Sequence, residues 1–239
     1  TGTKAWNKSS AQNRQGREAF VRALTHAYDR GLRYYDLADQ YGAHDYLKEA
    51  IQEAGMPRQE LMLLTKTNAR KADAITRDLD RFRMEIDTDY LDIVLLHCMT
   101  DANWTEKMKP CMDALSEAKA RGVIRAHGVS CHTLDALKAA AESPWVEVML
   151  SRINPFGVKM DAAPDEVAPV LRKAHENGKG MIGMKIFGEG ETADRADESL
   201  RFVLGLECIH AITIGFLTPE EIDDAIRRIG TVGATAPSV

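Results

Sequence analysis

The sequence predicts one α/β domain over residues 1–239, a (β/α)8 barrel, from two observations. Short apolar segments of strand length alternate with amphipathic helical segments along the chain. Each strand–helix repeat takes about thirty residues, the size of one βα unit, and no linker or low-complexity stretch interrupts the repeats. An open doubly wound sheet is the alternative, but it usually carries a GxGxxG turn after its first strand, and this chain has none.

Seven continuous apolar runs indicate buried parallel strands. They are Leu32–Ala38, Leu61–Thr67, Leu91–Cys98, Ile124–Ser130, Val146–Ile153, Gly180–Ile186 and Ala211–Phe216. A barrel needs one more strand before the first helix. We expect it from residues before or around Thr1–Ala5, so that the first strand is truncated in this chain.

Helices are expected between these runs because apolar residues recur there every three to four positions. In Arg17–Arg30, for example, Phe20, Leu24 and Tyr28 share one face. The other expected helices are His44–Ala54, Ala72–Met84, Glu106–Ala120, Leu134–Ala141, Pro164–Asn177, Ala196–Leu204 and Pro219–Ile229. Four glycines stand where helices should end, namely Gly31, Gly55, Gly122 and Gly178.

Composition restricts the kind of partner. The net charge of -5 gives no basic surface of the kind that nucleic acids or anionic membranes attract. The longest apolar runs have strand length, so no membrane span is expected. We therefore expect neither a nucleic-acid nor a membrane partner, and a cytoplasmic location. The chain begins at Thr1 without a targeting segment, so its natural start is expected to be missing and export stays open.

The cysteines give no metal or disulfide signature. Cys98, Cys111, Cys131 and Cys208 form no CxxC pair and no zinc-finger spacing. Buried, reduced thiols are therefore expected at all four positions, and no metal site is predicted. The neighbours Cys131 and His132 resemble a fragment of a metal site, but one pair of ligands is weak evidence.

Four polar residues fall at or just past the C-terminal ends of three successive strands: Asp36, Tyr41, Lys66 and His97. In a parallel barrel those strand ends face one cleft. Lys66 closes an apolar strand, where a buried lysine is costly unless it is paired or used. Taken alone, each residue also has a structural interpretation, as a loop charge, a turn aromatic or a core histidine. Their joint placement favours a site.

Such a set suits proton donation to an oxygen as a carbonyl becomes an alcohol. Free tyrosine has a pKa of about 10 and donates poorly near neutrality. An ammonium within about 4–6 Å stabilises the phenolate and lowers that pKa. Asp36 would hold Lys66 charged, and His97 would hydrogen-bond the substrate carbonyl or relay a proton to Tyr41. The hydride must come from a cofactor, because no side chain supplies one.

Four segments resemble the aldo-keto reductases, and the match runs from about Arg17 to Ile229. They are GLRYYDLADQYG, LMLLTKT, DTDYLDIVLLH and GVIRAHGVS. The resemblance implies a (β/α)8 barrel, NADPH-dependent reduction of a small aldehyde or ketone, and a catalytic tetrad. That tetrad maps onto Asp36, Tyr41, Lys66 and His97.

The resemblance also implies coenzyme-binding positions, with several departures. They are Ser130, Arg152, Met184, Lys185, Gly215 and Glu221. Ser130 matches the serine that holds the nicotinamide carboxamide. Glu221 stands where the family has an arginine for the adenosine 2′-phosphate. A carboxylate repels a phosphate and can instead accept a hydrogen bond from a ribose hydroxyl, so NADP(H) and NAD(H) are both candidates.

The family usually places asparagine, glutamine and an aromatic residue where this chain has Cys131, Arg152 and Met184.

Two other functions stay open. One is a Schiff-base lyase that uses Lys66 or Lys185, and the other is a non-enzymatic nucleotide-binding sensor or partner subunit. Trp104, after His97, is a candidate pocket wall or a packing residue.

Overall fold

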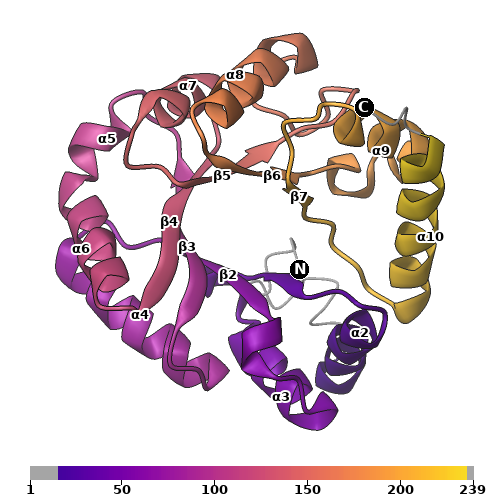
Figure 1. Ribbon diagram of the computed structural model, residues 1–239, viewed down its shortest axis with the longest axis horizontal. Coiled ribbons are helices and arrows are strands. Elements are labelled where there is room, and N and C mark those ends of the chain that lie inside the picture. Colours follow the sequence, from indigo (N-terminus) through magenta and orange to yellow (C-terminus); the bar gives the residue numbers. More distant parts are fainter. Residues whose placement is uncertain (1–15, 236–239) are drawn as a thin grey trace. The chain divides into compact units, whose positions relative to one another are not determined.

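The computed structural model describes residues 16–235, in which strands alternate with helices (Figure 1). Each of the seven predicted runs contains a strand or most of one, and β3 and β4 extend one residue past the predicted end. The strands are β1 Tyr34–Asp36, β2 Met62–Thr67, β3 Leu91–Met99, β4 Ile124–Cys131, β5 Val148–Arg152, β6 Gly180–Met184 and β7 Ala211–Ile212. The expected first strand around residues 1–5 lies outside the described residues.

The helices follow the predicted order. They are α2 Arg17–Asp29, α3 His44–Ala54, α4 Ala72–Ile86, α5 Trp104–Lys107, α6 Lys109–Ala120, α7 Leu134–Glu142, α8 Pro164–Glu176, α9 Ala196–Leu204 and α10 Pro219–Thr235. Short 3-10 helices are η1 Asp39–Tyr41, η2 Arg58–Glu60, η3 Gly188–Gly190 and η4 Ala193–Arg195. All four glycines that were expected to end helices have positive φ, the backbone conformation in which helices commonly terminate.

The prediction of one helix over Glu106–Ala120 is wrong. The segment forms two helices, α5 and α6, and Pro110 occupies the first turn of α6. Proline has no N–H, and its ring clashes with the carbonyl four residues earlier, which favours the break just before Pro110. Trp104 begins α5 and is 1% exposed. Its indole N–H donates to the carbonyl of Ala136 at 3.2 Å, so it is a packing residue and not an exposed wall.

The chain divides into two compact units. The first comprises residues 16–97, 108–127 and 215–223, and the second comprises residues 98–107, 128–214 and 224–235. Within the first unit β1 pairs with β2 and β2 with β3, all parallel. Within the second, β4 to β7 pair in chain order, also parallel. One domain over residues 1–239 stays a prediction.

Helices cover the first unit's strands in sequence order. Helix α2 packs beside α3, α3 beside α4 and α4 beside α6 (Figure 1). Phe20 of α2 meets Tyr46 of α3 edge to face at 5.2 Å, and Phe82 of α4 is fully buried. Burying a side chain of this size stabilises the fold by about 1.5–3 kcal/mol. The apolar faces therefore fix the helices against the sheet.

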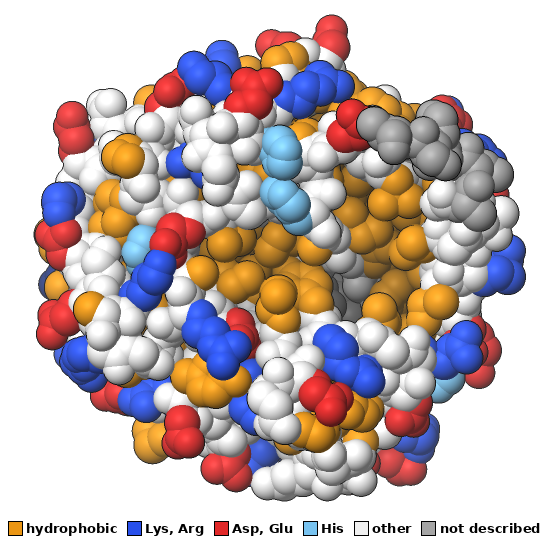
Figure 2. All heavy atoms as spheres, in the orientation of Figure 1, with side chains coloured by type: hydrophobic (Ala, Val, Ile, Leu, Met, Phe, Trp, Pro, Cys, Tyr) orange, Lys and Arg blue, Asp and Glu red, His pale blue; other side chains and the backbone are white. Residues whose placement is uncertain are grey.

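In the second unit α7 packs beside α8, and α8 lies against β6. Leu137 of α7 and Val167 and Leu171 of α8 are buried. No helix in the described part of the chain combines the length and apolarity that a membrane span requires. On the face in Figure 2, acidic and basic side chains are interspersed.

The register of β1, β2 and β3 positions the candidate site. Asp36 lies opposite Leu64, and Lys66 lies opposite Leu95. Because parallel strands all point the same way, their C-terminal ends lie at one edge of the sheet. Polar residues at those ends are thereby brought together within the first unit.

Gly128 gives a test of the β4–β5 pairing. A Cβ added there would lie 1.9 Å from the Val148 carbonyl oxygen, so Gly128→Ala must push the two strands apart. We expect a loss of about 1–3 kcal/mol or more, seen as a fall of roughly 2–4 °C in Tm per kcal/mol. Gly180→Ala is the matched control, because its Cβ would meet nothing closer than 3.5 Å. Equal losses in a thermal melt would contradict this account.

Candidate functional site

A buried ion pair forms the centre of the candidate site. Asp36 is the last residue of β1, and Lys66 lies near the end of the adjacent strand β2. The Lys66 ammonium contacts the Asp36 carboxylate and donates to the Leu37 carbonyl at 2.7 Å. Lys66 is 1% exposed and Asp36 6%. A charge at this depth is tolerated only when an opposite charge and hydrogen bonds replace the lost water.

Tyr41 lies over this pair. It ends the 3-10 turn η1, whose last N–H donates to the Ala38 carbonyl at 2.9 Å. Gly42 then turns the chain with a φ of 61°. The Lys66 ammonium stands 4.9 Å from the centre of the Tyr41 ring. A cation near the face of an aromatic ring is attracted by its quadrupole, so the contact holds the ring beside the ammonium.

His97 completes the group. It lies in β3, and its ring meets the Tyr41 ring edge to face, with centroids 6.2 Å apart. It is 3% exposed. The backbone carbonyl of His97 accepts a hydrogen bond from Arg70 at 2.7 Å. The structure therefore brings together all four predicted residues within the first unit, while their catalytic roles stay predictions.

Charged side chains anchor the turn that carries Tyr41. Arg81 of α4 pairs with Asp39 at 2.8 Å and with Asp78 at 2.9 Å. The hydrogen bond to Asp39 makes the largest contribution to raising the pKa of Arg81. Asp78 in turn accepts a hydrogen bond from the Thr67 hydroxyl at 2.5 Å. These supporting residues were not predicted, since only the fold brings helix α4 to this turn.

Four of the predicted coenzyme-binding residues lie in the second unit. Ser130 is fully buried in β4, and its hydroxyl oxygen accepts from the Cys98 N–H at 3.0 Å. Met184 ends β6 and is buried. The two cations already have partners, because Arg152 pairs with Asp161 at 3.0 Å and Lys185 with Glu189 at 2.6 Å.

The other two predicted coenzyme-binding residues lie in the first unit, before and within α10. Gly215 is exposed. Glu221 lies in the first turn of α10, and its carboxylate accepts from the Leu217 N–H at 2.6 Å. Glu221 therefore closes the loop before the helix. The carboxylate that is expected where the family has an arginine therefore has a structural partner of its own.

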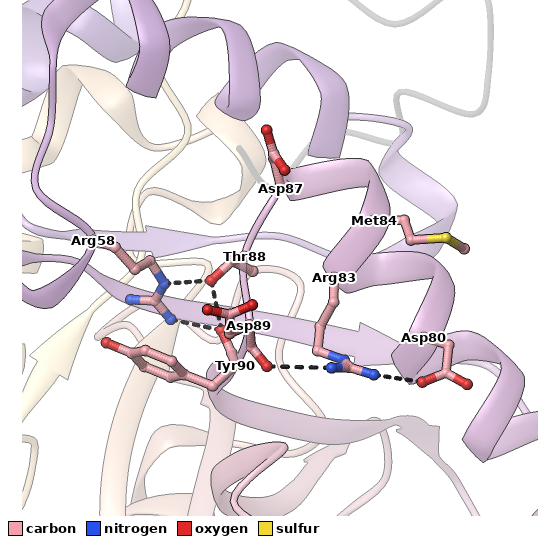
Figure 3. Close-up of a pocket in the computed structure, with 8 residues that line it drawn as sticks. All are labelled: Arg58, Asp80, Arg83, Met84, Asp87, Thr88, Asp89 and Tyr90. Atoms are coloured by element: carbon pink, nitrogen blue, oxygen red, sulfur yellow. Dashed lines mark hydrogen bonds and ion pairs between the residues drawn. The ribbon is translucent and has the colours of Figure 1, made fainter.

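A surface hollow of about 660 Å³ lies elsewhere in the first unit (Figure 3). Its lining residues are Arg58, Asp80, Arg83, Met84, Asp87, Thr88, Asp89 and Tyr90. They precede β3 or belong to α4 and η2, so the hollow lies by the strand beginnings and not by the strand ends. Arg58 and Arg83 donate to neighbouring side chains and carbonyls there (Figure 3). In parallel barrels, residues at this end contribute to stability, whereas the catalytic residues lie at the C-terminal ends of the strands.

The prediction of four buried thiols is wrong at one position. Cys111, Cys131 and Cys208 are buried, whereas Cys98 is partly exposed. Cys98 has a φ of 61°, so the strand is locally distorted at this residue. The neighbours Cys131 and His132 have different contacts, since the Cys131 thiol donates to the Ala136 carbonyl and His132 contacts Cys98.

Comparisons with known proteins point to one family. The family model for the aldo/keto reductase family matches residues 1–204. Methylglyoxal reductase DkgB of Salmonella typhi is 30% identical over 126 residues, which cover 52% of this chain and 46% of that protein. The NAD/NADP-dependent indole-3-acetaldehyde reductase of Schizosaccharomyces pombe is 26% identical over 137 residues, 56% of this chain and 47% of that protein. The chain thus spans about half the length of these curated relatives.

Solved structures show the same fold. An aldo-keto reductase of Bacillus halodurans in its holo form matches with a TM-score of 0.73 at 16% identity, covering 92% of this chain and 82% of that one. Aldose reductase of Giardia lamblia matches with a TM-score of 0.71 at 15% identity, and the match covers 92% of this chain and 88% of that one. The predicted α/β fold class and the family resemblance are confirmed. The chain belongs to the aldo/keto reductase family, a family of NAD(P)H-dependent oxidoreductases.

Proposed function

We propose that the chain reduces an aldehyde or ketone to an alcohol, with Tyr41 as the proton donor. The observation that carries this proposal is the buried Lys66, held between the Asp36 carboxylate and the face of Tyr41. A lysine kept charged beside a phenol stabilises the phenolate that remains once the proton has left. NAD(P)H supplies the hydride when bound.

Each residue has a distinct task in this proposal. Tyr41 gives its hydroxyl proton to the carbonyl oxygen as that oxygen gains charge. Asp36 keeps Lys66 protonated and aimed, because a lysine without a counterion would tend to lose its proton at this depth. His97 orients the carbonyl by a hydrogen bond, and Arg70 fixes the backbone of His97. Burial of the set keeps water from competing for these contacts.

The relatives suggest the substrate class. One is named for methylglyoxal and the other for indole-3-acetaldehyde, and both names denote small aldehydes. A small aldehyde is therefore the proposed substrate. The direct test is loss of reduced nicotinamide absorbance when methylglyoxal is added to the protein with NADPH or NADH.

The coenzyme proposal depends on charge. Ser130 would hold the carboxamide, and Met184 would present an apolar face to the nicotinamide. A 2′-phosphate needs an available cation. Arg152 and Lys185 already pair with Asp161 and Glu189, so the residues present fit NADH about as well as NADPH.

The Schiff-base alternative is less well supported. A lysine attacks a carbonyl as the neutral amine, but the Lys66 ammonium is paired with a buried carboxylate and Lys185 is paired with Glu189. Borohydride trapping with a carbonyl substrate would detect a covalent adduct if one formed. No contact in the described residues favours a non-enzymatic sensor over a reductase.

Replacing Tyr41 tests the proton donor. Tyr41→Phe removes only the hydroxyl, so we expect carbonyl reduction to fall by about 10²–10⁴-fold, the usual contribution of a positioned acid. Coenzyme affinity, measured by fluorescence quenching, should stay nearly unchanged. Tyr35→Phe is a matched control at another buried tyrosine, whose hydroxyl donates to the Leu24 carbonyl. Similar activity in Tyr41→Phe and wild type would refute the assignment.

A double-mutant cycle tests the Asp36–Lys66 pair. Lys66→Met leaves the Asp36 carboxylate buried without its lysine, which should cost about 3–5 kcal/mol of unfolding free energy. Asp36→Asn should be destabilising for the converse reason. The double variant should lose less than the sum of the two single losses, because neither charge is then left alone. Denaturant melts give the three values, and strictly additive losses would show that the two groups are not coupled.

The coenzyme preference tests the role of Glu221. We expect NADPH to bind no more than about tenfold tighter than NADH. Glu221→Arg should shift the ratio toward NADPH by about tenfold or more, the value of a new charge-assisted phosphate contact. Glu221→Gln is the control, since it keeps an acceptor for Leu217 but loses the charge. A wild-type preference of roughly a thousandfold for NADPH would mean that another cation makes the phosphate contact.

A further inference from the structure

Cys98 differs from the other three cysteines in its surroundings. Burial raises the pKa of the Cys111, Cys131 and Cys208 thiols, which keeps them protonated and unreactive near neutrality. Cys98 is partly exposed. The chain therefore contains one accessible thiol and three inert ones that can serve as internal references.

His132 lies beside this thiol. Its Nε2 is 3.5 Å from the Cys98 sulfur, and its Nδ1 is in contact with the Arg152 guanidinium. A guanidinium has donors only, so Nδ1 must accept, and the ring proton of a neutral imidazole is then on Nε2. His132 thus presents an N–H to the sulfur. A donated hydrogen bond favours the thiolate over the thiol.

Two further contacts hold this arrangement in place. Arg152 pairs at 3.0 Å with Asp161, whose side chain is only 2% exposed. Within the described residues, Asp161 Oδ2 and Arg152 Nε are buried and have no hydrogen-bond partner, so these two atoms are shielded from water, although the Arg152 side chain is 23% exposed. The Cys98 N–H donates to the Ser130 hydroxyl oxygen at 3.0 Å.

The backbone of Cys98 is in the left-handed region, a conformation that is uncommon outside glycine and tends to occur at functional sites.

We propose that Cys98 is a modification site, a thiol activated by His132 that hydroperoxides oxidise to a sulfenate. The thiolate sulfur attacks one peroxide oxygen, so that an S–O bond forms and the O–O bond breaks. Sulfur loses two electrons, the peroxide gains them, and the departing oxide takes up a proton to give water or an alcohol. Two equivalents of a small thiol restore the cysteine, through a mixed disulfide and with release of water.

The consequence for activity rests on the proposed function. Cys98 directly follows His97 in the chain, which orients the carbonyl in that proposal. A sulfenate is larger and more polar than a thiol, and it forms at the residue that continues the His97 backbone. Oxidation should therefore lower carbonyl reduction, and a small thiol should restore it.

Competitive labelling tests the reactivity without reference to catalysis. Native protein is treated briefly with iodoacetamide, and each cysteine peptide is quantified by mass spectrometry. Cys98 should react at least about tenfold faster than the other three cysteines. His132→Asn should slow Cys98 by about tenfold, whereas His26→Asn, which alters a histidine paired with Asp223, should not.

The labelling also has its own folding check. In a folded His132 variant the three buried cysteines stay protected, and if His132→Asn exposes them, His132→Gln replaces it. A wild-type Cys98 that reacts no faster than the buried thiols would overturn the proposal without any variant. So would a Cys98 that becomes reactive only after treatment with a chelator, because its sulfur would then be a metal ligand and not an activated thiol.

Hydroperoxide treatment tests the oxidation and its effect. A dimedone adduct should appear at Cys98 in wild type and not in Cys98→Ser, and its absence would overturn the proposal. Turnover should fall with oxidation in wild type and resist it in Cys98→Ser. Equal losses in both would refute the link to activity. If neither protein reduces carbonyls before treatment, the proposed function fails, and the adduct still decides the modification site.

Discussion

Burial of Lys66 is the constraint on which the candidate site depends. An ammonium 1% exposed needs a carboxylate in direct contact, and Asp36 provides it from the neighbouring strand. That contact requires β1 and β2 to be parallel and in the observed register, so that two strand ends bring the charges together. The turn after β1 then carries Tyr41 back over the ammonium. The pair therefore couples strand pairing to the position of the phenol.

The fold could be predicted to the extent that apolar burial determines it. Continuous apolar runs gave every described strand, because both faces of a parallel sheet are covered. The helix break was missed although Pro110 was visible in the sequence, because the apolar periodicity continues through it. The distorted end of β3 could not be predicted, because nothing in the run from Leu91 to Cys98 signals a positive φ. The spacing of apolar residues indicates which positions are buried. The backbone conformation of a single residue depends instead on its contacts in the folded chain, which that spacing does not show.

The site could be predicted only where residue type and strand position coincide. A lysine that closes an apolar strand is conspicuous, and the residues at the adjacent strand ends follow from topology. The supporting contacts could not be read in this way. Arg70 reaches the His97 carbonyl and Arg81 reaches Asp39, and both arginines resemble ordinary surface charges in the sequence. Long flexible side chains find acceptors that only the folded backbone supplies.

The second unit shows the same point for the coenzyme and for Cys98. Arg152 occupies a position where the family resemblance implies a coenzyme contact, but its charge is directed to Asp161 and His132. A cation that stabilises a buried carboxylate is a poor phosphate ligand, since leaving that carboxylate unpaired would cost more than an exposed phosphate contact returns. The contact of the same guanidinium with His132 Nδ1 leaves the ring proton on Nε2, toward Cys98. The position of Arg152 thereby disfavours 2′-phosphate recognition and favours a reactive thiol.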